Sequence, residues 1–321
     1  MTALRNAIVA MLALGSAIAP VPAAAQSQPL RIIVGFPPGA GADLISRVVG
    51  EKMQASLGRT VIVENRPGGG GILANETVKN AAPDGNTILM TPFATMVAYP
   101  YSYSKLSYDP FKDYAPVAHL ASFQLAFGIG DAVPAKTLAE YVALAKQDNK
   151  YRNFASAAAG SLPHFFGVMF ARTAGIEMIH VPYRGTAPAL QALVGGEIPA
   201  AMVTLADIGE LARSGKARVL ANSGGARAPS FPNVPTFKES GYDIEGTAWY
   251  AMFAPAGTPA NLLAPLTKAA ADAVKMADVQ KRLADMGLEP TGYDAARLAA
   301  IMKADYDKWG PPIKASGFKA D

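Results

Sequence analysis

The 321-residue sequence contains no cysteine and only three histidines, His119, His164 and His180. Without cysteine the chain forms no disulfide, holds no zinc–cysteine or iron–sulfur centre and has no cysteine nucleophile. The histidines lie far apart and form no HExxH pattern, so a structural zinc site is not expected. A chain of this length can bury a hydrophobic core large enough to be stable without a disulfide or a structural metal. We therefore expect neither a metal nor a cofactor.

Charged residues are also scarce, at 17% of the chain against about 25% in an average soluble protein. The 29 Lys and Arg and 25 Asp and Glu leave a formal charge of +4, with no run of Lys or Arg. This pattern lacks the basic footprint of a nucleic-acid-binding protein. The length predicts about two domains, and we expect a monomer.

The first 25 residues have the layout of a secretory signal peptide. Arg5 precedes an uncharged apolar run from Ala7 to Ala19, and Ala23 to Ala25 offer a small-residue cleavage site. The alternative, a membrane anchor, would need about 20 apolar residues, and this run is shorter. We expect export to the periplasm with cleavage near Ala25.

Strand-like and helix-like segments alternate after residue 29, which favours an α/β fold with mainly parallel sheets flanked by helices. The first strands are expected at 31–34, 60–64 and 87–90, with helices at 43–57 and 71–82 between them. Residues 92–116 have weak periodicity and are interpreted as a long surface connection. A second series has expected strands at 153–156, 178–181, 198–203 and 217–221 and helices at 138–147, 163–174, 187–194 and 207–213. Three further helices are expected at 261–276, 277–286 and 294–309.

Two long apolar segments, 117–129 and 247–254, have the character of strands that cross between domains. They predict a discontinuous first lobe at 26–123 and 248–321 and a second lobe at 124–247. Two lobes joined by two hinge strands enclose a cleft that can open and close.

The first candidate site is the loop from Gly35 to Asp43, between the first strand and the first helix. Small residues leave its backbone N–H groups accessible, and a helix N-terminus attracts carboxylate or phosphate. We select Phe36, Pro38, Gly39, Ala40 and Gly41 as ligand-binding residues, and Asp43 as a cap or turn anchor at the same site. An ordinary capped loop is the alternative.

A dinucleotide site is a further interpretation of this loop, since Gly39 and Gly41 follow a strand and Glu64 ends the next one. Leu44 occupies the third glycine position, however, and two prolines stiffen the turn. An exported protein also meets little free NAD.

The second candidate site, residues 153–164, repeats this arrangement in the second predicted lobe. Ser156, Gly160 and Ser161 form a small-residue loop, with Ser161 as the expected helix cap and His164 in the first turn. Two such loops facing a cleft would hold an anion between two helix N-termini. A hydrolase with Ser161 as nucleophile and His164 as base is the alternative, although no GxSxG elbow is present.

Tyr183 and Arg184 follow the end of a predicted strand, and the Arg184 guanidinium could bind a second carboxylate. A solvent-exposed arginine is the alternative. Further candidates for the rim of the cleft are the loop 92–95 and the strand end 203–207, from which we select Phe93, Thr204 and Asp207, together with Thr91. We interpret Trp249 and Tyr250, on the second hinge strand, as hinge or core packing rather than ligand contacts.

Six motifs in order make the chain resemble the Bug family, the periplasmic solute receptors of tripartite tricarboxylate transporters. They are Phe36–Asp43 (FPPGAGAD), Val63–Gly71 (VENRPGGGG), Ala82–Gly85 (APDG), Tyr108–Asp113 (YDPFKD), Gly160–His164 (GSLPH) and Val181–Gly185 (VPYRG). The resemblance extends from Pro29 to Ile313. The resemblance implies a type II periplasmic binding protein fold. It also implies a receptor that delivers a carboxylate to membrane permease subunits.

In that family, one ligand carboxylate is held largely by backbone groups of loops that correspond to Phe36–Gly41 and to Ser156, Gly160 and Ser161. The chain departs from the pattern at Ala40 and Ala42, where Gly and Thr are usual, and at Val203, where an acid is frequent. The missing acid makes a ligand with an amino group less suitable and favours a dicarboxylate or an aromatic carboxylate. A ligand-sensing partner of a histidine kinase is a second alternative to the transport receptor.

Overall fold

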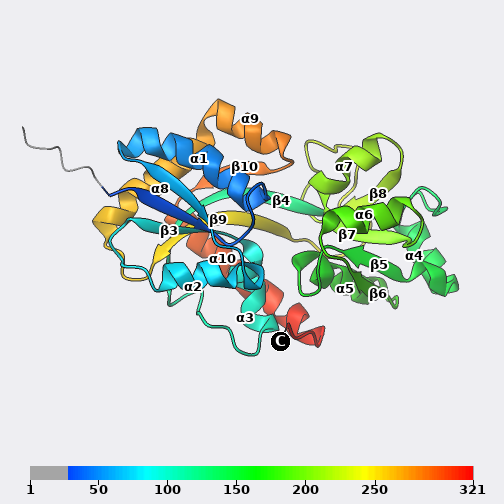
Figure 1. Ribbon diagram of the computed structural model, residues 1–321. Coiled ribbons are helices and arrows are strands. Elements are labelled where there is room, and N and C mark those ends of the chain that lie inside the picture. Colours follow the sequence, from blue (N-terminus) through cyan, green and yellow to red (C-terminus); the bar gives the residue numbers. More distant parts are fainter. Residues whose placement is uncertain (1–27, 321) are drawn as a thin grey trace, which may run out of the picture.

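The computed structural model describes residues 28–320, and the predicted signal peptide at residues 1–25 lies outside this range. The described chain forms two α/β lobes side by side, joined by strands that run between them (Figure 1). This arrangement confirms the predicted fold class.

The first lobe is built on a sheet whose strands β2, β1 and β3 are parallel. Their bounds are Leu30–Val34 for β1, Val61–Asn65 for β2 and Thr87–Pro92 for β3. The helices of this lobe are α1 (Gly41–Leu57), α2 (Ile72–Lys79), α3 (Tyr99–Ser102), α8 (Ala260–Lys275), α9 (Ala277–Asp285) and α10 (Ala295–Ala315). Apolar residues of α1 and α8 share one buried cluster with the strands, which fixes where α1 begins relative to β1.

The second lobe has its own parallel strands, in the order β7, β5, β6. Its strands are β5 (Asn153–Ser156), β6 (Ile179–Pro182), β7 (Ala200–Thr204) and β8 (Ala217–Asn222). Its helices are α4 (Leu138–Gln147), α5 (Leu162–Ala174), α6 (Thr186–Val194) and α7 (Leu205–Arg213). Helices α5, α6 and α7 directly follow β5, β6 and β7 along the chain, so their N-termini gather at one end of the sheet.

Strands β4 (Tyr114–Gly130) and β9 (Thr247–Pro255) join the lobes. β4 pairs with β9 from Tyr114 to Gln124, and from Leu125 onward it pairs with β7 and β8. This change of partner supports our proposed lobe boundary at residues 123–124.

The interpretation of residues 92–116 as a surface connection is wrong. The segment contains a π-helical turn (Ala94–Ala98) and α3, and the side chains of Met96 and Val97 are fully buried. Tyr108 is buried as well, and its hydroxyl donates to the Thr95 carbonyl at 2.7 Å. Tyrosine can bury its ring while its hydroxyl finds a backbone partner, so a Tyr-rich stretch need not be exposed.

Strand β10 (Glu289–Tyr293) was not predicted, because its short sequence contains Pro290 and Gly292. It pairs antiparallel with β4, beginning beside the cleft where Glu289 pairs with Ser122 and running toward Tyr293, which pairs with His119.

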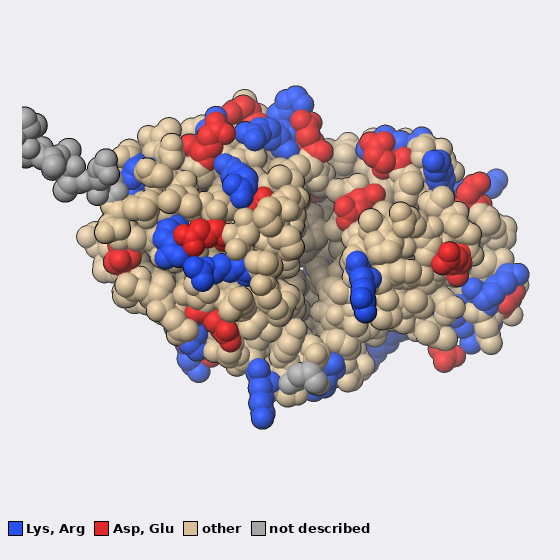
Figure 2. Space-filling view, in the orientation of Figure 1, with Lys and Arg blue, Asp and Glu red and all other residues tan. Residues whose placement is uncertain are grey.

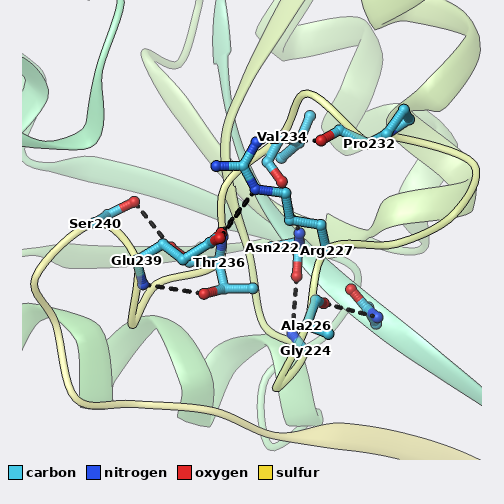
Figure 3. Close-up of polar contacts among 10 residues, drawn as sticks. Asn222, Gly224, Ala226, Arg227, Pro232, Val234, Thr236, Glu239 and Ser240 are labelled. Carbon is cyan, nitrogen blue, oxygen red and sulfur yellow. Dashed lines mark hydrogen bonds and ion pairs between the residues drawn. The ribbon is translucent and has the colours of Figure 1, made fainter.

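The segment between β8 and β9 contains no helix or strand in residues 223–246, all of which are described. Polar contacts order it (Figure 3). The Arg227 Nε donates to both carboxylate oxygens of Glu239, at 3.0 and 2.9 Å, and Glu239 and Thr236 hydrogen-bond each other reciprocally. These contacts fix the path by which the chain returns from the second lobe to β9.

Candidate functional site

A cavity of about 800 Å³ lies between the two lobes. Residues at the starts of α1, α5, α6 and α7 line it, together with residues of β3, β4, β7 and β9 and the segments that adjoin them. Met286 and Leu288, between α9 and β10, complete the lining. The hollow between the lobes is walled mainly by uncharged residues in the space-filling view (Figure 2). Among residues 28–320, no Lys or Arg lines this cavity, and Asp207 is its one formally charged residue.

The loop before α1 is held by Asp43, which is 1% exposed. Its carboxylate accepts hydrogen bonds from the Gly39 N–H and the Asn65 side chain, each at 2.9 Å, and pairs with Arg47. Burial alone would raise the pKa of this carboxyl, but the hydrogen bonds from Arg47, Gly39 and Asn65 outweigh it and hold the pKa below its usual value. Asp43 therefore fixes the loop and leaves Ala40 and Gly41 at the cavity wall.

Ser161 caps α5 and lines the cavity. Its hydroxyl donates to the Ala158 carbonyl at 2.7 Å and accepts from the His164 backbone N–H at 3.4 Å. The His164 imidazole Nδ1 accepts from the Gly160 N–H at 3.1 Å. Since the serine proton and this ring nitrogen both have other partners, the geometry does not activate Ser161 as a nucleophile.

The other two helix starts complete the site. Gly185 and Thr186 bring the N-terminus of α6 to the cavity, and Thr204 caps α7 by accepting from the Asp207 N–H at 3.1 Å. Asp207 places its own carboxylate in the first turn of α7. That charge compensates the partial positive charge at this helix terminus.

Aromatic side chains form much of the wall. The Phe123 and Tyr250 rings lie 5.4 Å apart, and the Phe93 ring packs edge-on against the buried Trp249. Burial, together with the nearby Asp207 charge, raises the pKa of Tyr250 to about 12. Tyr250 is therefore a neutral hydroxyl at the cavity wall at ordinary pH.

Some of the residues selected from the sequence line this cavity and others do not. Those that line it are Phe36, Ala40, Gly41, Phe93, Ser161, Thr204 and Asp207. Those outside its lining are Pro38, Gly39, Asp43, Thr91, Ser156, Gly160, His164, Tyr183 and Arg184.

The residues outside the lining have identifiable roles or positions. Thr91 is buried and its hydroxyl lies 2.6 Å from that of Thr95. Tyr183 packs against the core of the second lobe, and Arg184 is exposed. Ser156 and His164 lie behind the second loop, in contact with His180.

Sequence reasoning missed part of the apolar wall. The lining residues outside every candidate segment are Leu44, Phe123, Ala248, Met286 and Leu288, and Tyr250 was interpreted as packing. Other lining residues lie within the candidate segments 92–95, 153–164, 180–186 and 203–207 but were not selected individually; they are Pro92, Ala94, Ala157, Leu162, Pro163, Gly185, Thr186, Val203 and Ala206. The start of α6 could have been found, because a motif ending at Gly185 was already recognised and a helix follows it. Met286 and Leu288 depend on β10, which the sequence did not predict.

Within residues 28–320, no group of His, Asp and Glu side chains has an arrangement that could hold a metal ion. No helix in this range is long and apolar enough to cross a membrane.

Two lobes, a cleft between them and helix N-termini converging on that cleft define a solute-binding receptor. The family model for the tripartite tricarboxylate transporter family receptor matches residues 45–318, and the chain belongs to this family. The resemblance found from the motifs is thereby confirmed.

Named relatives agree with this assignment. Protein BugT of Bordetella pertussis is 29% identical over 322 residues, with 99% of each chain covered. The solved structure of the periplasmic binding protein BugD has a TM-score of 0.77 at 28% identity and covers 91% of this chain and 99% of its own. MatC of Rhodopseudomonas palustris, solved with bound malate, has a TM-score of 0.76 at 31% identity, with 89% of this chain and 98% of its own covered. A second R. palustris protein, solved with adipate, has a TM-score of 0.81 at 25% identity, with 91% and 98% covered.

Proposed function

We propose that the protein is an exported, non-catalytic receptor that captures a small carboxylate in the cleft and delivers it to the permease subunits of a tripartite transporter. The observation that carries this proposal is the convergence of four helix N-termini on one cavity. A helix N-terminus has N–H groups without partners inside the helix and carries roughly half a positive charge, which together attract an anion.

The cavity walls support a narrower ligand class, a monocarboxylate with an apolar or aromatic body. Three of the converging termini remain available to an anion, because Asp207 already compensates the fourth. A second ligand carboxylate would find no lining Lys or Arg among the described residues, and an unpaired buried charge is costly. Phe36, Phe123 and Leu288 offer apolar surface to the rest of the ligand.

The same features favour a receptor over the hydrolase alternative, because Ser161 is engaged as a helix cap. Membership in a transporter receptor family supports the permease as partner. The predicted leader and the periplasmic description of relatives such as BugD support the periplasm as location. Neither nucleic acid nor a second copy of the chain is part of the proposal.

Native mass spectrometry of gently purified protein will show whether a carboxylate co-purifies. Calorimetry with hexanoate and adipate then tests the class, because the two ligands have equal chain length and differ by one carboxylate. We expect hexanoate to bind at least about tenfold more tightly, a difference of about 1.4 kcal/mol. Asp207→Asn should reduce the difference in affinity between hexanoate and adipate, since it removes the charge that repels the second carboxylate of adipate.

Equal or tighter binding of adipate by the wild-type protein would overturn the ligand class. A protein that carries no carboxylate and binds neither probe would overturn the receptor proposal itself. Hydrolysis of ester substrates that is lost in Ser161→Ala would establish the enzyme alternative.

A further inference from the structure

The C-terminal residues reach from the first lobe to the ligand loop of the second. Helix α10 contacts α3 in the first lobe and α5 in the second (Figure 1). The Ala320 N–H donates to the Ser102 carbonyl at 2.7 Å, which anchors the last described residue to α3. Phe318, two residues earlier, packs against the start of α5.

Phe318 lies directly against Gly160, in the loop that precedes α5. A Cβ built on Gly160 would lie 2.5 Å from the Phe318 ring, and Gly160 has a φ of +73°. Only glycine suits both the left-handed backbone and this close approach. The same ring meets His164 edge-on at 5.2 Å and Phe165 at 5.8 Å.

On the side of the loop away from the cavity, two stacked histidines also hold the loop in place. The His164 and His180 rings lie 4.0 Å apart with 20° between their planes. His164 Nδ1 accepts the Gly160 N–H, and His180 Nε2 lies 2.7 Å from the Ser156 hydroxyl. Because that hydroxyl donates to the Ala158 carbonyl at 3.0 Å, His180 Nε2 is the donor to Ser156. Burial lowers the pKa of both rings to about 4, so they are neutral near pH 7.

We propose that Phe318 and His164 are positioning residues that preorganise the loop 157–161 for its anion. Neither residue lines the cavity; each acts through Gly160, whose neighbour Ser161 does line it. A loop held before the ligand arrives loses less entropy on binding, so its N–H groups bind more tightly. The inference rests on the proposed carboxylate receptor.

The loop itself provides the first test, which needs no ligand. In hydrogen exchange on the full-length protein, Phe318→Ala should speed exchange of the Gly160 amide about tenfold or more, because the covering ring is gone. Phe318→Tyr should restore protection. Phe111→Ala is the matched control, since Phe111 is an exposed ring that packs on Tyr306 of α10, away from the loop. Unchanged exchange in Phe318→Ala, or an equal increase in the control, would overturn the proposal.

Two variants of His164 test whether its side chain holds the loop by accepting the Gly160 N–H. His164→Leu removes the acceptor for the Gly160 N–H, whereas the Asn side chain in His164→Asn offers an oxygen near the position of Nδ1. With hexanoate as the probe, we expect about fivefold weaker binding for His164→Leu and for Phe318→Ala, recovery in His164→Asn, and no change in Phe111→Ala. Thermal unfolding checks that each variant is folded. Failure of the wild-type protein to bind hexanoate counts against the proposed function, while the exchange result decides the role of the loop separately.

Discussion

The contact between Gly287 and Ala206 predicts how a single methyl group can hold the cleft open. Gly287 follows α9 in the first lobe, and Ala206 lies in the first turn of α7 in the second. A Cβ built on Gly287 would lie 2.2 Å from the Ala206 Cβ and 3.0 Å from its Cα. Carbon atoms pack at about 3.5–4.0 Å, so Gly287→Ala requires the lobes to separate by more than about 1 Å at this point.

The substitution has a second cost that must be separated from the first. Gly287 has a φ of +74°, where an alanine costs about 1–2 kcal/mol in folding stability. Gly257 is a matched control: its φ is +78°, and a Cβ built on it would have nothing within 4 Å. Gly257→Ala should therefore lose similar stability while it leaves the contact between the lobes intact.

Calorimetry with hexanoate and small-angle scattering measure the consequence. We expect Gly287→Ala to bind about tenfold more weakly, equal to about 1.4 kcal/mol, and to show a smaller decrease in radius of gyration on binding than the wild-type protein. Gly257→Ala should match the wild type in both measurements. Unchanged affinity in Gly287→Ala, or equal losses in the two variants, would refute the reasoning.

Three further outcomes follow from the geometry. Arg184→Ala should leave the affinities for hexanoate and adipate unchanged in calorimetry, because Arg184 is exposed and lies outside the cavity lining; a selective loss of adipate binding would show that it reaches the ligand. Ser161→Ala should lower the free energy of unfolding by about 1 kcal/mol through loss of the α5 cap, as denaturant titration will measure, and no change would contradict the capping role. Burial raises the pKa of Asp305 to about 6, above its unfolded value near 3.8, so stability that is present below about pH 4 is lost as the pH rises toward 6. Asp305→Asn should remove this loss in thermal melts across that range, and an unaltered pH profile would contradict it.

Local signals in the sequence predicted two elements of the second lobe with their observed bounds. The helix at 138–147 and the strand at 153–156 match α4 and β5 residue for residue. The cause is short-range for α4: Thr137 caps the helix by accepting from the Glu140 N–H, and apolar residues follow the helical period. Such signals identify where a helix begins, and therefore where an anion-binding terminus lies.

The cavity wall could not be predicted in the same way, because it forms only where distant segments meet. Tyr250 was interpreted as hinge packing, yet it lines the cavity beside Phe123 from the other hinge strand. Leu288 lines the cleft immediately before β10, a strand that was not predicted because it contains a proline and a glycine. Nothing within a local window places these three side chains together.

In the proposed site, backbone N–H groups and cavity-wall side chains have different roles, which would allow one fold to bind different carboxylates. Helix termini bind an anion through N–H groups that every residue except proline possesses, so this part of the site depends little on side-chain identity. The cavity wall depends on it, because Asp207, Phe123 and Tyr250 line the cavity where the rest of the proposed ligand would lie. Under the proposed function, motifs in the loops indicate a carboxylate, while side chains from β4, β9 and the start of α7 would select among carboxylates.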